Sequence, residues 1–519
     1  MSNSTDPNQI TPQKGHPAGL YLLFFTEMWE RFSYYGMRAI LVLFMTKMMM
    51  FDTKLASGVY GNFTALVYLT PLIGGLISDR YWGNRKSILV GGVTMAIGQF
   101  LLFFCASVIS TESNLDTILF IAGLSVLVIG NGFFKPNIST MVNQLYAPGD
   151  KRVDAAFSIF YMGINLGAFF SPLICGALAE KIDYKWGFFA AGVGMVLGVL
   201  LFEMLKNKYI VTAAGEPIGV KPNKARDVEA AGATTATGAK QSEFSTGRVV
   251  LWLAIYAALW GIFMFVVGFN WISTLVFATS IAAAGFIITD PTLSKVERDR
   301  IVVIYIAAFF VIFFWSAFEQ AGASLTLFAD QQTDRFIFGW EMPASWFQSV
   351  NPLAIIVFAP IFAMIWTRLG NKNMEPASPL KQAMGLFLLS LGYLVIAYGV
   401  KGVGNEAKIS MFWLLGMYLM HTWGELCLSP IGLSMVARLS PARLASLLMG
   451  VWFLANAMAN DFAGMLSKLY PKEGPTNFFG TQITDMYDFF MIFVVLSGVA
   501  AIILFLISKR MLKLMHGLR

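Results

Sequence analysis

Two carboxylates and a guanidinium lie close together inside the first long apolar segment, in the run Glu27-Met28-Trp29-Glu30-Arg31-Phe32-Ser33-Tyr34-Tyr35-Gly36. On a helix, the charged residues and Tyr34 share one face, because they follow Glu27 at three, four and seven positions. A charged side chain at bilayer depth is costly, so the run indicates a functional site that faces a bundle interior or a water-filled cavity. The alternative is a structural ion pair that fixes helix packing.

Three later apolar segments each contain one more charged residue. Lys135 lies in Gly130-Asn131-Gly132-Phe133-Phe134-Lys135-Pro136, where it either reaches the interface with its ammonium group or pairs with an intramembrane carboxylate. Glu319 follows Trp315 by one helical turn, and its proton affinity would depend on whether a cation such as Lys135 is its partner. Glu425 precedes a helix breaker in Gly424-Glu425-Leu426-Cys427-Leu428-Ser429-Pro430. Glu319 is therefore a candidate proton carrier.

A glycine-rich basic run, Gly74-Gly75-Leu76-Ile77-Ser78-Asp79-Arg80-Tyr81-Trp82-Gly83-Asn84-Arg85-Lys86, connects the second and third apolar segments. The paired glycines allow close helix approach, and Gly83 suits a tight turn. Asp79 and the basic residues can form a charge network that breaks when helices move. An ordinary cytoplasmic loop would explain the charges but not the glycine spacing. The residues that form this signature are Gly75, Asp79, Arg80, Gly83, Arg85 and Lys86.

The composition is that of a polytopic membrane protein. Of 519 residues, 57% are hydrophobic and 13% are charged, against about 25% charged in soluble domains. The three cysteines, Cys105, Cys175 and Cys427, have neither pair nor metal spacing, so no disulfide framework and no metal site are expected. Residues 1–19 lack a basic region followed by an apolar core, and no cleavable signal peptide is expected.

The segments that carry the charged residues belong to a set of fourteen predicted membrane helices, each with about 20 apolar residues. They arrange as six, two and six, which predicts an all-α protein with two six-helix bundles and two extra central helices. The predicted helices are 20–49, 56–79, 86–109, 116–140, 153–179, 187–206, 248–268, 270–289, 300–329, 346–369, 381–400, 409–436, 443–468 and 484–508. The predicted parts are an N-terminal tail (1–19), a first bundle (20–206), a linker (207–247), the central pair with its connection (248–299), a second bundle (300–508) and a C-terminal tail (509–519).

The distribution of Lys and Arg predicts the orientation. With both termini in the cytoplasm, most of the 37 basic residues fall in cytoplasmic connections, as the positive-inside rule requires. The basic balance therefore needs no nucleic-acid partner. Arg31, Arg38 and Lys135 remain inside the membrane. Predicted depth also suggests an outer gate between Lys54 and Asp330.

Five runs together resemble the proton-dependent oligopeptide transporter (POT) family of the major facilitator superfamily. They are E-x-x-E-R-F-x-Y-Y-G, G-N-G-F-F-K-P-N-I-S, F-Y-x-x-I-N-x-G, F-E-Q and G-E-L-x-L-S-P-I-G-L, and they occur in family order across both halves. The loop run also resembles the superfamily's loop signature. The resemblance implies a bacterial-type member with the major facilitator fold, a multi-pass protein of the bacterial inner membrane. It implies symport of protons with di- and tripeptides by a monomeric functional unit embedded in the lipid bilayer, without any cofactor other than the proton.

The resemblance also implies roles for matching residues. Glu27, Glu30 and Arg31 would form a proton-coupling triad, and Lys135 would form a salt bridge with that triad or with Glu425. Arg31 and Lys135 would receive the peptide carboxylate, with the protonation site Glu319 nearby, and Glu425 would receive the amino terminus. The other residues that would line the cavity are Tyr34, Tyr68, Tyr161, Asn165, Trp315, Asn351 and Trp452. Ala168, Ala459 and Asp461 depart from the family pattern, and Asp461 has no assigned role.

Three other functions are alternatives to peptide symport. Symport of another small anion or metabolite fits less well with the intact E-x-x-E-R run. A membrane-embedded enzyme is disfavoured, because the sequence has no phosphate-binding glycine loop, no metal-ligand cluster and no Ser/His/Asp grouping. His421 is the only histidine in a predicted span. A receptor or sensor stays open at this point.

Overall fold

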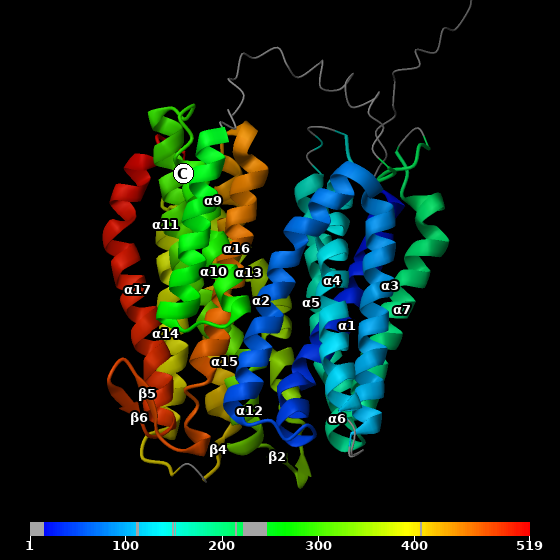
Figure 1. The fold of residues 1–519 in the computed structure, drawn as a ribbon, viewed down its shortest axis with the longest axis vertical. Coiled ribbons are helices and arrows are strands. Elements are labelled where there is room, and N and C mark those ends of the chain that lie inside the picture. Colours follow the sequence, from blue (N-terminus) through cyan, green and yellow to red (C-terminus); the bar gives the residue numbers. More distant parts are fainter. Residues whose placement is uncertain are drawn as a thin grey trace, which may run out of the picture.

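The computed structural model describes residues 15–109, 114–147, 150, 152–212, 215–221, 246–404 and 407–518. In these ranges it contains the predicted fourteen helical segments (Figure 1). Most ends of the predicted helices agree with the structure to within several residues. The predicted linker falls mainly in 222–245 and the predicted N-terminal tail mainly in 1–14, both outside the described residues.

The first bundle contains six membrane-length segments. They are α1 (Ala18–Lys47), α2 (Thr53–Ile77) with η1 (Ser78–Trp82), α3 (Asn84–Val108), α4 (Leu115–Gln144), α5 (Val153–Ser171) with η2 (Pro172–Gly176) and α6 (Ala177–Lys181), and α7 (Tyr184–Tyr209). Asp52 caps α2, where its carboxylate accepts the Leu55 N–H at 2.6 Å. η2 begins at Pro172, which has no N–H to continue the α-helical ladder, and is a π-helical turn.

The second bundle also contains six. They are α11 (Lys295–Phe318) with η4 (Glu319–Gly322) and α12 (Ser324–Gln331), η5 (Ala344–Ser349) with α13 (Val350–Asn371), α14 (Ser378–Val400), α15 (Met411–Leu439), η6 (Ala442–Leu444) with α16 (Ala445–Ser467), and α17 (Met486–Leu514), which follows η7 (Pro471–Glu473). Ser294 and Glu297 form a capping box at the start of α11.

Short strands occur only in connections between described helices of the second bundle. β1 (Thr333–Asp334) pairs in parallel with β4 (Ile409–Ser410), with Thr333 opposite Ile409. β2 (Phe336–Ile337) pairs with β3 (Trp340–Glu341), and β5 (Thr476–Phe478) pairs with β6 (Thr481–Ile483), both antiparallel. The fold is therefore all-helical, with small hairpins at one end.

Eleven of the helical segments are long and apolar enough to cross a membrane by length and composition. The three outside this set are α1, α15 and α16. These helices contain Glu27, Glu30 and Arg31 on α1, Glu425 on α15 and Asp461 on α16, all buried. The charged groups that make these three helices less apolar than the other eleven are thus buried inside the protein.

The two bundles converge toward the end of the molecule that the basic-residue pattern predicts to be extracellular (Figure 1, lower end). At the α2–α16 contact, Gly61 and Gly464 face each other so closely that a Cβ on Gly61 would lie 2.6 Å from Cα of Gly464. Ser57 and Ser467 form a hydrogen bond of 2.9 Å beside them. Small residues therefore let the backbones of the two bundles touch.

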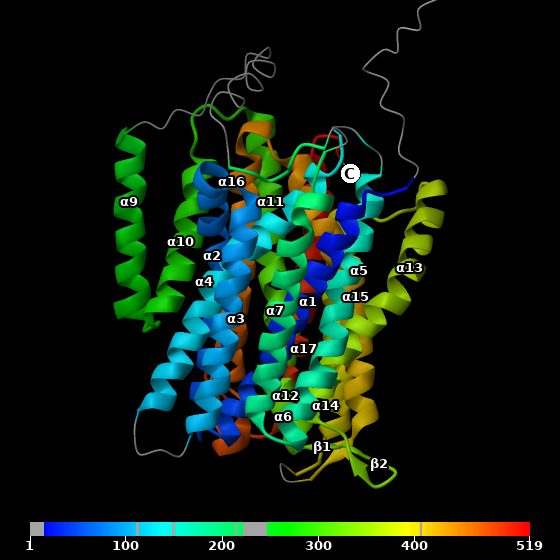
Figure 2. The same ribbon diagram turned by 90° about the vertical axis from the view of Figure 1, so that its right-hand side faces the viewer.

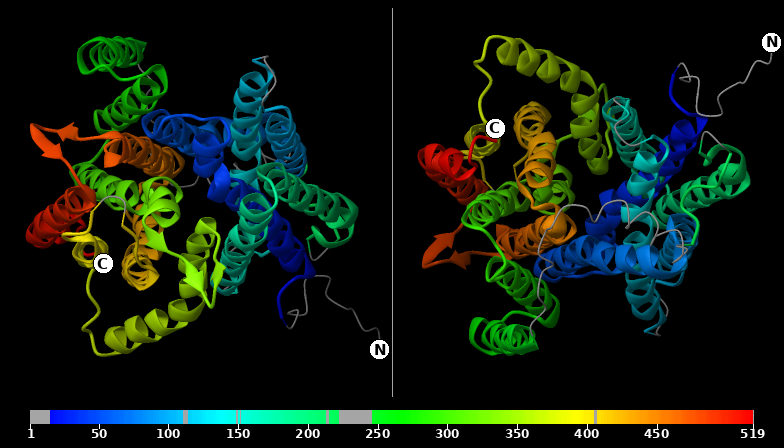
Figure 3. Two further views of the ribbon diagram at one scale, coloured as in Figure 1. Left: turned by 90° about the horizontal axis from the view of Figure 1, so that it is seen from below. Right: turned by 90° about the horizontal axis from the view of Figure 1, so that it is seen from above.

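The central pair comprises α9 (Thr246–Gly261) with η3 (Ile262–Val267) and α10 (Trp271–Ile288). Figure 2 and Figure 3 show the pair at the edge of the second bundle, with α13 at the opposite edge. α10 packs against α16 and α2, whereas α9 contacts α10 and has no buried residue. This apolar pair therefore packs on the outside of the bundles, away from the polar residues between them.

Candidate functional site

A polar cavity of about 180 Å³ lies between the two bundles. α1, α2 and α5 line it from the first bundle, and α11, η4, η5, α13 and α15 line it from the second. The predicted site residues in its wall are Tyr68, Tyr161, Asn165, Trp315, Glu319, Asn351 and Glu425. The structure therefore brings together residues that are more than 350 positions apart in the sequence.

The predicted triad forms on α1 behind the cavity wall. Nε of Arg31 lies 2.8 Å from Oε1 of Glu27 and 2.7 Å from Oε2 of Glu30. Asn131 on α4 donates its amide N–H to Oε1 of Glu30 at 3.2 Å. All three charged side chains are buried, and Oε2 of Glu27 has no hydrogen-bond partner among the described residues. Two carboxylates around one guanidinium leave one excess negative charge, which a proton would neutralise.

Lys135 lies beside the cavity without the predicted salt bridge. Its Nζ is 4.2 Å from the centroid of the Tyr68 ring, which is part of the cavity wall. Within the described chain, no carboxylate oxygen lies within the 4.0 Å of an ion pair with Lys135. In this conformation the ammonium group therefore rests on an aromatic face and makes no ion-pair contact with a described carboxylate.

Arg38, which received no role from the sequence, is the ion-pair partner of Glu319. Nη2 of Arg38 contacts Oε2 of Glu319, and Nε donates to the hydroxyl of Tyr60 at 2.7 Å. The expected Glu319–Lys135 pair is therefore absent here. Because Arg38 belongs to α1 and Glu319 to η4, the pair connects the two bundles. Arg38 could have been found as the one intramembrane basic residue left without an assignment.

Glu425 has a neutral partner. Asn351 donates from Nδ2 to Oε2 of Glu425 at 2.8 Å and also contacts Oγ1 of Thr422 at 3.1 Å. No cation pairs with Glu425 in the part of the chain that the structure describes. Its carboxyl group therefore stands in the cavity wall with a neutral hydrogen-bond donor and without a cationic partner among the described residues.

Several predicted site residues lie elsewhere. Tyr34 is buried and stacks on Phe63, with ring centroids 6.4 Å apart, and Trp452 packs tightly against Gly432 of α15. Neither residue lines the cavity, and neither do Arg31 and Lys135. A helical pattern gives the face that residues share but not the rotation of that face relative to other helices. The cavity residues with polar side-chain atoms that sequence reasoning missed are Tyr35, Arg38, Gln348, Tyr418 and His421.

Polar contacts close the predicted outer end of the cavity. Nζ of Lys47 lies 2.6 Å from Oδ1 of Asp330. The predicted partner of Asp330 was Lys54, and this prediction is wrong, because Lys47 is the residue of the first bundle that pairs with it. The carboxylate of Glu180 on α6 accepts the backbone N–H groups of Ala344 and Ser345 at 2.7 and 2.9 Å. These two residues begin η5 of the second bundle, where free N–H groups attract an anion.

η5 also contacts the irregular turn at η2. Ser349 donates to the carbonyl of Phe169 at 2.8 Å, and the Trp346 indole donates to the carbonyl of Leu173 at 3.1 Å. A π-helical turn that contains a proline leaves backbone carbonyls available to such partners. The outer ends of the two bundles are therefore closed by hydrogen bonds as well as ion pairs.

The loop signature binds its own bundle. Gly83 has φ +73°, as its predicted tight turn requires, and Arg85 donates to the carbonyl of Ile218 at 2.5 Å and to Oδ1 of Asn207 at 2.9 Å. The close approach to α4 occurs at Gly74, not Gly75. Arg80 and Asp79 are exposed, Asp79 has no ion pair with any described residue, and Lys86 lies over the Trp82 ring at 5.1 Å. The predicted charge network around Asp79 is thus absent in this conformation.

Comparisons with known proteins agree with this architecture. The POT family profile matches residues 85–478. This chain belongs to the POT family. It is 35% identical over 468 residues to the peptide transporter YePEPT of Yersinia enterocolitica, covering 87% of this chain and 88% of the relative. It is 31% identical over 525 residues to the di-/tripeptide transporter of Lactococcus lactis, covering 97% and 98%. The uncharacterized transporter YclF of Bacillus subtilis is 35% identical over 482 residues, covering 91% and 92%.

Solved POT structures have the same fold. A crystal structure of peptide transporter POT in complex with sulfate is 33% identical, covers 97% of both chains and has a TM-score of 0.78. A POT family transporter in complex with 5-aminolevulinic acid is 30% identical, covers 96% of this chain and 98% of that one, and also has a TM-score of 0.78. This POT family member is accordingly a multi-pass membrane transporter of the major facilitator type and not an enzyme. The predicted fold class and family are confirmed.

Proposed function

We propose that this POT transporter carries di- and tripeptides across the membrane together with protons, by alternating access between the two bundles. One observation carries the proposal. Glu425, a carboxyl group without a cationic partner among the described residues, lies in the cavity wall on the second bundle. Lys135, an ammonium group without an ion-pair contact in the same part of the chain, lies against the cavity wall on the first. A zwitterionic peptide has the complementary pair of charges, with its amino terminus for Glu425 and its carboxylate for Lys135.

The rest of the cavity suits the body of a peptide. Asn165 and Asn351 offer amide groups to the peptide backbone, and the aromatic rings of Tyr68, Tyr161 and Trp315 offer apolar surface to variable side chains. A few fixed polar groups at the ends with adaptable aromatic walls between them favour many peptides of similar length. The relatives named for di- and tripeptides support this substrate class.

Proton coupling is assigned to the triad and to Glu319. With two carboxylates around one guanidinium, protonation of Glu27 or Glu30 would weaken the hold on Arg31 and free its charge for the peptide carboxylate. Glu319 would take up a proton when Arg38 leaves it, because a buried carboxylate without a cation is costly. Since the Arg38–Glu319 pair connects the bundles, protonation of Glu319 would also favour outer opening.

We also place the transporter in a bacterial inner membrane, as a monomeric functional unit with both termini in the cytoplasm. The bacterial origin of the relatives supports the bacterial membrane. The distribution of basic residues supports the orientation. In this orientation, the observed conformation is closed to the outside.

The first test is uptake of labelled dialanine by purified protein in liposomes, with and without an inward proton gradient. Peptide should accumulate only with the gradient, and protein-free liposomes provide the background. If the protein accumulates no di- or tripeptide under any gradient, the proposal is wrong. 5-Aminolevulinic acid is tested in parallel, because a relative binds it in a solved structure. Accumulation of this compound without any peptide uptake would assign the metabolite alternative instead.

A second test asks whether Glu425 binds the amino terminus. N-acetyl-dialanine lacks the ammonium charge, so it should compete for the wild-type site about 10- to 150-fold less well than dialanine, the range of one charge-assisted hydrogen bond. In the Glu425→Gln variant, the two compounds should compete almost equally. An undiminished preference for the free amino terminus in this variant would contradict the assignment. Dialanine amide with Lys135→Gln provides the matched experiment for the other end.

A further inference from the structure

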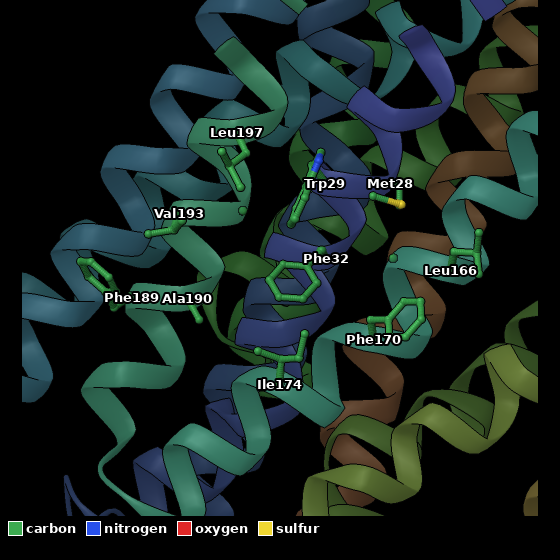
Figure 4. Close-up of a pocket in the computed structure, with 12 residues that line it drawn as sticks. Met28, Trp29, Phe32, Leu166, Phe170, Ile174, Phe189, Ala190, Val193 and Leu197 are labelled. Atoms are coloured by element: carbon green, nitrogen blue, oxygen red, sulfur yellow. The ribbon is translucent and has the colours of Figure 1, made fainter. Parts of the chain in front are cut away.

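A second and larger cavity, of about 430 Å³, lies on the far side of α5 from the polar cavity. α1 forms its floor, and α5 and α7 form its walls (Figure 4). All its lining residues are apolar, and Trp29 carries the only polar side-chain atom among them. We refer to this cavity as the α1 groove. Its lining residues are Met28, Trp29 and Phe32 of α1, Leu166, Gly167 and Phe170 of α5, Ile174 of η2, and Phe189, Ala190, Val193, Gly194 and Leu197 of α7.

α5 separates the α1 groove from the polar cavity. Asn165 and Ala168 line the polar cavity, whereas Leu166, Gly167 and Phe170 line the groove. One face of α5 therefore lines the polar cavity, and another face lines the apolar groove. A zwitterionic substrate would find no charged partner in the groove, where the indole nitrogen of Trp29 is the one polar side-chain atom of the lining. The groove therefore suits an apolar occupant.

The rim of the groove is continuous with the lipid-facing surface. Phe170, Ile174 and Leu197 on the rim are 47%, 45% and 43% exposed, and all three lie on helices that cross the membrane. Lipid hydrocarbon is the medium that meets such a surface at this depth. A narrow apolar groove open to hydrocarbon fits a flexible alkyl chain. We propose that the α1 groove binds one acyl chain of a bilayer lipid.

The bound chain would pack against the helical turn that holds the proton-coupling triad. Met28, Trp29 and Phe32 face the groove, while Glu27, Glu30 and Arg31 point away from it on the same turn. The walls press closely on this turn. A Cβ on Gly167 would lie 2.3 Å from the carbonyl oxygen of Met28, and a Cβ on Gly194 would lie 2.6 Å from the Phe32 ring. The acyl chain thus supplies the third side of the packing around this part of α1.

The test uses the fluorescence of Trp29 in vesicles of phosphatidylcholine with mid-chain bromine atoms, which quench tryptophan on contact. The protein has 13 tryptophans, so the signal of Trp29 is the difference between wild type and Trp29→Phe. Trp271 is the reference, because it is 57% exposed on α10 and the Trp271→Phe difference reports ordinary lipid contact. An acyl chain in the groove should quench Trp29 at least as strongly as Trp271, although Trp29 is less exposed. Weaker quenching of Trp29 would overturn the proposal.

A groove-filling substitution provides the matched control. Val193→Phe places a ring in the groove and should reduce quenching of Trp29 at least twofold, whereas Met204→Phe adds a ring to an exposed site on α7 outside the groove and should leave quenching unchanged. Equal quenching in both variants would overturn the proposal. If Val193→Phe does not fold, the comparison of Trp29 with Trp271 in otherwise wild-type protein still decides. A disulfide-linked dimer of Val193→Cys, formed at low protein-to-lipid ratio, would instead assign the groove to a second copy of the chain. None of these readouts requires transport activity.

Discussion

Removal of Arg38 should open the outer end of the transporter in a pH-dependent way. Arg38 is the partner of Glu319 across the bundles, and the Glu319 side chain is only 6% exposed. In Arg38→Gln, the closed conformation would bury a carboxylate that no described cation neutralises. In an outward-open conformation the same carboxylate would be hydrated. The substitution therefore destabilises the closed conformation specifically.

Two estimates bound the effect. Breaking a buried ion pair by removing one partner costs about 3–5 kcal/mol. The protein can avoid the buried charge by protonating the carboxyl group, and protonating a hydrated glutamate at pH 7 costs about 3.7 kcal/mol, from a reference near 4.3 and 1.36 kcal/mol per pH unit. The less costly route sets the result, so the closed conformation should lose roughly 3–4 kcal/mol, or about 150- to 1,000-fold in population, at pH 7.

The sign of the pH dependence follows from the same linkage. In the variant, the closed conformation holds one more proton than the open conformation, so acidification favours closing. At pH 5.5 the cost of protonation falls to about 1.6 kcal/mol, so acidification should return a large part of the population to the closed conformation.

The assay is a distance distribution between spin labels at Leu115→Cys and Phe412→Cys, exposed positions that begin α4 and α15 at the predicted outer end. The three native cysteines are buried, which favours selective labelling. Arg38→Gln should lengthen the distance at pH 7, and acid should shorten it again. The double variant Arg38→Gln with Glu319→Gln should stay closed at both pH values, because replacing both partners leaves no buried charge. A closed distribution in the single variant at pH 7, or an open one that does not respond to pH, would show that the Arg38–Glu319 pair does not stabilise the closed conformation.

Three other substitutions test the remaining contacts. Glu180→Ala removes the acceptor of two backbone N–H groups of η5, and each bond to a charged group contributes about 1.5–3 kcal/mol, so the same labels should report at least tenfold more outward-open protein. The exposed control Glu203→Ala should leave the distance distribution unchanged, and an unchanged distribution in Glu180→Ala would contradict the role of Glu180. Gly464→Ala places a Cβ 2.6 Å from Cα of Gly61 and should prevent outer closure, whereas Gly261→Ala adds a methyl group in open space and should leave outer closure intact. Equal distance distributions in these two variants would argue against the close α2–α16 contact. Asn351→Ala removes the donor to Glu425 and should raise the KM for dialanine roughly 5- to 150-fold with little change in kcat, because a buried polar group loses its partner. A KM within twofold of wild type in liposome uptake would exclude a role of Asn351 in positioning Glu425 for substrate.

The helices could be predicted from the sequence because membrane-length apolar segments are a strong local signal. The charged run on α1 was interpretable for the same reason, since residues within two turns of one helix have a fixed geometry. Arg31 accordingly contacts both Glu27 and Glu30, which share its helix face as their spacing predicted. Their role in proton coupling stays a proposal.

Contacts between helices were not predictable in the same way. Arg38 and Lys135 were both intramembrane cations, and only the relative placement of the two bundles decides which one reaches Glu319. Asp330 likewise meets Lys47 rather than Lys54, a choice that depends on how α1 ends. Tyr34 lies on α1, which lines the cavity, but stacks on Phe63 instead, because a sequence does not specify helix rotation. Trp452 lies on α16, which contributes no residue to the cavity wall.

Asp461 is a further intramembrane residue whose surroundings depend on contacts between helices. It was an acid without a role, and the structure places it on α16, the helix against which α10 packs, with Oδ2 buried and without a hydrogen-bond partner among the described residues. It does not line the polar cavity. Its position favours a role in the packing of the central helix pair over a role in substrate binding.

The proposed coupling of proton movement to peptide movement rests on the triad on α1. Accumulation and exchange of labelled dialanine in liposomes that contain the Glu30→Gln variant test this coupling. The variant should no longer concentrate peptide under an inward proton gradient but should still exchange external for internal peptide. If Glu30→Gln protein concentrates dialanine under that gradient as wild type does, Glu30 is not the coupling site.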